Sequence, residues 1–207
     1  MVTRPSSSRS KVVTGSREVL LAVLPGADVA LEPCDLLGVD RFLDQDARDA
    51  GTSPVDGDTN MSDIEEVRTY LAKENGLATV STTQADGRVL SSVVNCGVID
   101  HPLTCAPCVA LVSAGGAARL SHVRRGSQVT IAIRRGWTWR SVTGPADLIG
   151  LDDLPDGIDA EALRLLLREV FQAAGGTHDD FDEYDRAMAT EGRVAVLVAP
   201  DRILGNY

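Results

Sequence analysis

Aromatic residues are scarce in this chain of 207 residues: three phenylalanines, three tyrosines and two tryptophans make up 4% of it. Proteins that bind single-stranded nucleic acid stack bases on aromatic side chains, and binding to a phosphate backbone requires a dominant positive face. The formal net charge of this chain is −10, which is the opposite balance. The composition therefore predicts a protein without a nucleic-acid partner.

Long hydrophobic runs are also missing. No segment approaches the roughly 20 apolar residues of a membrane-spanning helix. The nearest candidate, Val19–Leu24, is short and is followed at once by Pro25 and Gly26. The basic stretch before it is long and rich in serine, unlike the start of a signal peptide. We predict a cytoplasmic protein with no membrane partner.

Cysteine and histidine are few, with four and three residues respectively. Cys105 and Cys108 have the C-x-x-C spacing of redox and zinc sites, but a zinc site needs a second pair of ligands, and only Cys96 is near. A thioredoxin-like pair lies before a helix, whereas this pair precedes the apolar, strand-like segment 109–112. We interpret it as two cysteines facing each other near a hairpin turn, and we predict no metal site.

Carboxylates are absent from one long segment. Between Asp100 and Asp147 there is no Asp or Glu. In an acidic chain, such a local positive field is suited to a phosphorylated or polycarboxylate ligand. The run Ser113–Arg119 (SAGGAAR) places flexible backbone N–H groups beside a guanidinium. We therefore expect an anion to bind here. The six arginines of the segment are Arg119, Arg124, Arg125, Arg134, Arg135 and Arg140.

Two parts of the chain differ in composition. Residues 1–60 begin with a stretch rich in Ser, Arg and Thr, and they end with GTSPVDGDTN, which is typical of a linker. The patterns that predict helices and strands become clear from Met61 onward. We predict a poorly ordered N-terminal extension over residues 1–60 and one folded domain over residues 61–207.

The hydrophobic patterns of the domain alternate between the periods of strands and helices. Strands are predicted over residues 77–83, 88–98, 109–113, 129–133, 137–149 and 194–198, the fifth of them interrupted by Gly144 and Pro145. Helices are predicted from Met61 to about Asn75 and over residues 116–125, 158–174 and 179–190. Hairpins join most of the strands, and no crossover helix separates the first three, so a doubly wound sheet is excluded. The pattern predicts a mainly β (α+β) fold: a six-stranded antiparallel barrel with peripheral helices.

The ordered segments resemble a known superfamily. LATVSTTQADGR at residues 77–88, followed by Ser91–Asn95, resembles the opening hairpin of the split β-barrel flavin and deazaflavin oxidoreductases, the superfamily of pyridoxamine 5′-phosphate oxidase. Segments 115–124, 136–144 and 193–206 resemble its actinobacterial branch, which uses coenzyme F420. The resemblance extends from about Asp63 to Tyr207, and it implies the FMN-binding split-barrel fold.

The resemblance also implies a homodimer in which each barrel forms half of two cofactor sites. Residues 92–95 would flank the flavin or deazaflavin ring, and the segment 113–119 would hold the phosphate. Arg124 would extend the positive field toward the acidic tail of F420. Many relatives carry Lys where this chain has Arg119. The positive charge is the same, but a compact ammonium group is replaced by a planar guanidinium group. The predicted cofactor-binding residues are Ser92, Val94, Asn95, Ser113, Gly115, Gly116, Arg119, Leu120 and Arg124.

The predicted function is an oxidoreductase that transfers hydride from reduced F420 to an unsaturated small organic acceptor. Two alternatives remain open: an FMN enzyme of the pyridoxamine-phosphate-oxidase type, and a non-catalytic barrel that binds flavin or F420. No side chain of this chain is predicted to be a catalytic acid or base, because the cofactor carries the chemistry.

Several other residues are expected to have structural roles. The remaining arginines of the acid-free segment are predicted to lie in hairpins or on the surface. We expect Trp137 and Trp139, on one face of a strand, to pack in the core or a dimer interface. His122 is expected at the surface or an interface, and the acidic run 179–185 is expected to be a solvated helix.

Overall fold

The structure of the protein is a computed structural model that describes residues 61–206. The predicted extension over residues 1–60 lies outside the described residues. No helix among those residues is both long and apolar enough to cross a membrane.

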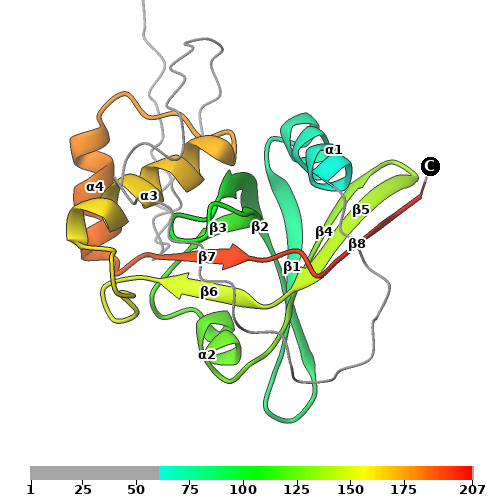
Figure 1. Ribbon diagram of the computed structural model, residues 1–207, viewed down its shortest axis with the longest axis horizontal. Helices are drawn as coiled ribbons and strands as arrows, with labels where there is room; N and C mark the ends of the chain where they lie inside the picture. The colour runs from blue at the N-terminus through cyan, green and yellow to red at the C-terminus, as the bar shows by residue number, and fades with distance from the viewer. Residues whose placement is uncertain (1–60, 207) are drawn as a thin grey trace, which may run out of the picture.

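One curled antiparallel sheet organises the domain (Figure 1). Its eight strands run in the order β6-β7-β3-β2-β1-β4-β5-β8. The long strand β2 connects the two halves, because residues 89–95 pair with β1 while residues 96–100 pair with β3. The strands are β1 (Leu77–Thr83), β2 (Val89–Asp100), β3 (Pro107–Ser113), β4 (Val129–Arg135), β5 (Thr138–Gly144), β6 (Ala146–Ile149), β7 (Val194–Val198) and β8 (Arg202–Gly205).

The predicted mainly β fold with peripheral helices is confirmed, but the prediction of six strands is wrong. The expected strand 137–149 breaks at Gly144 and Pro145, so that β5 pairs with β4 and β6 pairs with β7. A side chain at Gly144 would lie 1.8 Å from the carbonyl oxygen of Ala199, which explains the glycine at this crossing. The additional strand β8 comes after Ala199 in the chain and pairs with β5.

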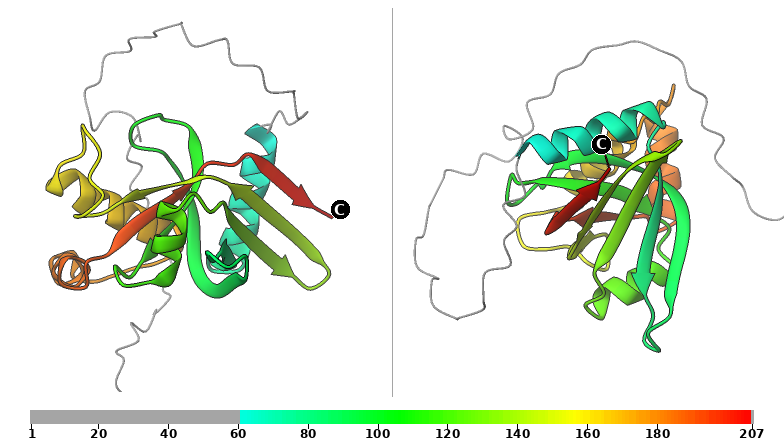
Figure 2. Two further views of the ribbon diagram at one scale, coloured as in Figure 1. Left: turned by 90° about the horizontal axis from the view of Figure 1, so that it is seen from below. Right: turned by 90° about the vertical axis from the view of Figure 1, so that its right-hand side faces the viewer.

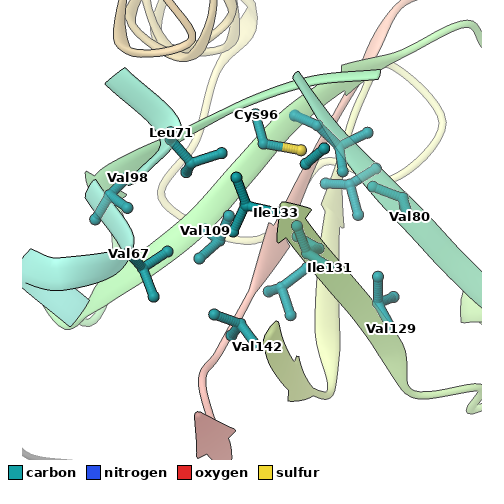
Figure 3. Packing of buried hydrophobic residues seen from close by; sticks show 14 of the residues in the cluster. Val67, Leu71, Val80, Cys96, Val98, Val109, Val129, Ile131, Ile133 and Val142 are labelled. Carbon is teal, nitrogen blue, oxygen red and sulfur yellow. The ribbon is translucent and has the colours of Figure 1, made fainter. Parts of the chain in front are cut away.

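The inside of the curled sheet holds the larger hydrophobic core (Figure 3). Alternate residues of each strand point into it, as in Ala78, Val80 and Thr82 of β1. The helix α1 (Met61–Lys73) closes one end through Ile64, Val67 and Leu71, all at most 2% exposed. Its apolar residues recur at helical spacing, so a single face of α1 is buried.

Two helices cover the other face of the half-sheet β6-β7-β3-β2 (Figures 1 and 2). They are α3 (Ala160–Ala173) and α4 (Phe181–Thr190), capped by the side chains of Asp159 and Asp180 respectively. Leu163, Leu166, Leu167 and Val170 of α3 pack on this second core. The acidic run 179–185, expected to be a solvated helix, lies at the start of α4. It is less solvated than expected, because Asp185 forms ion pairs with Arg164 and Arg168 of α3.

Candidate functional site

Arg119 and Ser92 are the centre of the candidate site. Arg119 lies on the short helix α2 (Ala118–Arg124), and Ser92 lies on β2. A guanidinium Nη2–H of Arg119 donates a hydrogen bond of 2.7 Å to the Ser92 hydroxyl oxygen. The neighbouring residues Leu120 and Val123 are buried in the core and fix the position of the helix. The structure therefore brings together two of the predicted site residues that are 27 positions apart.

The Arg119 guanidinium is a partly buried cation without a carboxylate partner. Within residues 61–206, its hydrogen bond to Ser92 is the only polar contact of the side chain, and no acid lies within 4.0 Å. Burial lowers the pKa of Arg119, opposed by the nearby Cys96 thiol, whose own pKa burial raises to about 12. Because arginine stays protonated in proteins, the charge remains in place and favours an anion.

The loop between β3 and α2, which precedes Arg119 in the sequence, has backbone donors that are not in use. The amide N–H groups of Gly115 and Gly116 form no hydrogen bond with any other group in the described part of the chain. A side chain at Gly115 would lie 2.4 Å from the carbonyl oxygen of Gly192, whereas Gly116 faces open space. The hydroxyl of Ser113 is buried and donates a long hydrogen bond of 3.5 Å to the Ala114 carbonyl. Free amides and a guanidinium suit a phosphate group.

A cavity of about 240 Å³ adjoins β2 on the side of α3 and α4. Val94 and Asn95, two of the predicted ring contacts, line it together with Val112, the residue before Ser113. The Asn95 side chain is held in place because its amide nitrogen donates a hydrogen bond of 2.8 Å to the Asn75 carbonyl. The other lining residues are Val170, Phe171, Ala174, Gly176, Tyr184, Met188 and Arg193.

Two predicted site residues have other contacts. The Leu120 side chain is fully buried in the barrel core, so it supports the helix and does not face the cavity. Arg124 forms a bidentate ion pair with Asp153, with N–O distances of 3.0 and 2.5 Å. Asp153 lies in the turn after β6, far along the sequence, and it neutralises the charge predicted to reach an acidic cofactor tail.

Two structural expectations for this segment were wrong. His122 is buried, not at the surface, and its Nδ1 lies 2.9 Å from the Thr82 hydroxyl. Arg140 is only 6% exposed and binds Glu66, with a closest N–O distance of 2.8 Å, and the Asn206 carbonyl. Arg140 points inward because it shares a face of β5 with the core residue Val142. Arg134 and Arg135 lie exposed at the β4–β5 hairpin, as expected.

The two tryptophans do not pack in the core. Trp137 is 91% exposed and Trp139 is 37% exposed. Trp139 pairs with Arg134 across the β4–β5 hairpin. The prediction that they pack in the core is therefore wrong, and the alternative, packing in a dimer interface, stays a prediction.

The cysteines of the C-x-x-C sequence do not face each other. Cys105 is exposed in the turn, at a backbone φ of 53°, whereas Cys108 is buried on β3 beneath α3. Burial raises the pKa of the Cys108 thiol to about 12, which disfavours a reactive thiolate. Within the described residues, no group of three metal-ligating side chains was found.

Sequence reasoning missed the helical wall of the cavity. Phe171, Tyr184 and Met188 come from helices that were predicted, but only as core or solvated elements. Arg193, immediately before β7, was not considered for the site at all. Its position directly before a strand of five apolar residues is the signal that was available.

No family model matches this chain. Among solved structures, it is similar to a pyridoxamine 5′-phosphate oxidase-related, FMN-binding protein from Nostoc punctiforme: the TM-score is 0.52 at 13% identity, over 70% of this chain and 82% of that one. The fold is that of the FMN-binding split barrels. A conserved hypothetical protein from Mycobacterium tuberculosis has the same fold, with a TM-score of 0.51 at 17% identity, over 75% of this chain and 89% of that one.

Proposed function

We propose that this split barrel is an oxidoreductase that transfers hydride from reduced coenzyme F420 to an unsaturated small organic acceptor. The observation that carries the proposal is Arg119, a half-buried cation with no carboxylate partner among residues 61–206. In the sequence it follows Gly115 and Gly116, whose amides form no hydrogen bond within the described residues. A protein rarely leaves a buried charge unpaired, because the desolvation of that charge is costly. A bound phosphate would provide the missing partner.

The residues of the site fit a cofactor that carries both a phosphate and a flat ring. Arg119 and the two glycine amides would hold the phosphate, and Ser92 orients the guanidinium. Val94 and Asn95 would lie against the ring, with the apolar cavity beyond them. When bound, such a cofactor supplies two-electron hydride chemistry, while the protein positions it and excludes water.

An FMN enzyme is the second candidate, and the Arg124–Asp153 pair favours it. F420 carries an acidic tail beyond its phosphate, and Arg124 was the cation predicted to meet that tail. Because Asp153 binds one edge of this guanidinium through both carboxylate oxygens, the charge of Arg124 is already paired and gives a second anion little attraction. A single anion-binding site, at Arg119, is sufficient for the monophosphate of FMN.

We also propose a homodimer formed through the outer face of the half-sheet β2-β1-β4-β5-β8 (Figure 2, right). One row of residues crosses all five strands on this face, and its members are small or apolar and are exposed or half-buried. The row consists of Val93, Thr79, Ala132, Ser141 and Leu204. An exposed face of small and apolar residues can pair with its own copy about a two-fold axis.

A parallel titration of the full-length protein with F420 and with FMN tests the proposal. Quenching of F420 fluorescence at micromolar concentration, with weaker binding of FMN, is the expected result. Tight binding of FMN alone would transfer the assignment to the second candidate. Binding of neither would contradict both enzymes. If a reduced cofactor binds but no unsaturated acceptor reoxidises it, the protein is a carrier and not an enzyme.

A further inference from the structure

The cavity under α3 and α4 has walls suited to a flat apolar molecule. The rings of Phe171 and Tyr184 lie with their centroids 4.7 Å apart at 36°, and both line the cavity. Val94, Val112 and Met188 supply aliphatic surface around them. The Tyr184 hydroxyl donates to the Leu167 carbonyl at 3.1 Å, so the tyrosine offers its ring and not its proton. Ring faces and aliphatic side chains favour planar ligands.

The volume of the cavity limits the size of the ligand. About 240 Å³ is below the roughly 300–1,000 Å³ of drug-sized ligand pockets. A flavin-type cofactor with its ribityl phosphate would not fit inside. The space is instead adequate for a compact molecule of about two fused rings, next to the strand segment where the cofactor ring is proposed to lie.

Arg193 provides the main polar group of this cavity. Its Nε–H and an Nη2–H both bind one carboxylate oxygen of Glu191, at 2.8 and 2.5 Å. Since a guanidinium has five N–H donors, three remain available for a ligand. Glu191 already balances the charge of Arg193, so an anionic ligand would gain little and would be repelled by the carboxylate. The pair thus favours an uncharged hydrogen-bond acceptor, such as a carbonyl oxygen.

We propose that this cavity binds a compact, planar, uncharged conjugated carbonyl compound, with its carbonyl oxygen toward Arg193. The assignment deepens the proposed function and rests on it, because this compound would be the acceptor. In that role, Arg193 donates to the oxygen on which negative charge develops during reduction, which stabilises the reaction where it is needed. Met188 and Arg193 separate this cavity from a second one of about 310 Å³ between α3 and α4.

Binding of three matched probes by NMR titration, without cofactor, tests the assignment. Chromone is an uncharged bicyclic conjugated ketone, chroman lacks its carbonyl, and chromone-2-carboxylate adds a negative charge. We expect the full-length protein to bind chromone at least severalfold more tightly than either of the others. Equal or tighter binding of the carboxylate would overturn the inference, because it would mean that Glu191 does not neutralise the site.

Three variants locate the binding. Val112→Phe, which fills the cavity from β3, should abolish chromone binding. Arg193→Met should weaken chromone binding about tenfold, the effect of losing one hydrogen bond to a charged group, and leave chroman unchanged. Ala189→Phe changes the wall of the second cavity and serves as the control, with unchanged affinity expected. Wild-type affinity in Val112→Phe, or loss only in Ala189→Phe, would refute the assignment.

The same samples separate this inference from the proposed function. Each variant is also titrated with F420 and FMN, and its thermal unfolding is recorded to confirm folding. If chromone binds as described but neither cofactor binds, the proposed function fails and the cavity assignment stands. If a cofactor binds but no probe binds, with or without that cofactor, the cavity assignment alone is wrong.

Discussion

Arg119 on α2 donates a 2.7 Å hydrogen bond to Ser92 on β2, and this bond determines where the guanidinium points. Without Ser92, the side chain would be free to turn toward solvent. With it, the cation is held against β2. The bond thus fixes the position of the positive charge that we propose as one side of an anion-binding site.

The tight packing of Gly115 predicts a sharp difference between two adjacent glycines. In Gly115→Ala, the new methyl group would meet the Gly192 carbonyl oxygen at 2.4 Å, so the loop must shift. We expect a loss of about 1–3 kcal/mol in the free energy of unfolding and weaker cofactor binding. Gly116→Ala, which meets nothing within 4 Å, is the control. Denaturant unfolding and cofactor titration measure both, and equal effects of the two changes would contradict the account of this loop.

The buried contacts of Arg140, far from the candidate site, are expected to stabilise the fold. Its guanidinium binds Glu66 of α1 and the carbonyls of Trp139 and Asn206, and it lies 4.8 Å from the centre of the Tyr70 ring. Arg140→Met should therefore lower the free energy of unfolding by about 2–3 kcal/mol. Hydrogen exchange of β8 should increase as well, because the chain end loses its anchor.

Arg134→Met, at the exposed end of the same hairpin, is the matched control and should change stability by less than about 0.5 kcal/mol. Cofactor affinity should be unchanged in both variants. A similar loss of stability in the two would mean that the buried network of Arg140 does not hold the C-terminal strand.

The ion pairs between α3 and α4 predict a dependence on pH. Hydrogen bonds from Arg168 and Arg164 lower the pKa of Asp185 from its ordinary value of 3.8. A carboxyl whose pKa is lower in the folded state adds stability above its unfolded pKa, and this stability is lost as the pH falls through the folded value. Asp185→Asn should therefore be less stable than wild type at pH 7, and the difference should shrink as the pH falls from about 4 to 2.

Asp182→Asn is the control for this titration, because Asp182 is 86% exposed and lies 3.6 Å from Arg168. Thermal unfolding as a function of pH should show little difference between this variant and wild type. A constant difference between wild type and Asp185→Asn at every pH would indicate a packing effect and not a titration.

The proposed dimer predicts that a single charge on the outer sheet face dissociates it. Val93 is 66% exposed at one end of the row that crosses five strands. Val93→Glu should convert a particle with the mass of two chains into one with the mass of one chain in light scattering. Leu151→Glu, at a residue 57% exposed outside this face, should leave the dimer intact. A monomeric wild-type protein would rule out this interface.

The sequence was sufficient to predict helices and hairpins that are determined by the pattern of neighbouring residues. The leucines of the predicted helix 158–174 recur at helical spacing, and α3 is found at Ala160–Ala173. The hairpin of β1 and β2 was equally clear, because a Gln-Ala-Asp-Gly turn separates two runs rich in β-branched residues. Arg119 was identified because it follows Gly115 and Gly116 in a segment without acids, and the structure shows it bound to Ser92, while its role in a cofactor site stays a prediction.

Features that depend on distant partners could not be predicted. Nothing near Arg124 in the sequence indicates that Asp153 binds it, because the partner comes from the turn after β6. The interruption at Gly144 and Pro145 was predicted, but not the close approach of the Ala199 carbonyl to Gly144, which comes from a distant part of the chain. The burial of His122 similarly depends on Thr82, forty positions earlier. Each of these contacts is set by the curl of the sheet and not by local pattern.

The affinity of the Arg119→Glu variant for F420 and FMN tests the central claim most directly. Arg125→Glu introduces the same charge change on the exposed side of the chain at the end of α2, so it is the matched control. The account predicts that Arg119→Glu binds the preferred cofactor at least a hundredfold more weakly than wild type, with the same circular dichroism spectrum, while Arg125→Glu binds normally. Unchanged affinity in folded Arg119→Glu would contradict the phosphate site on which the proposed function rests.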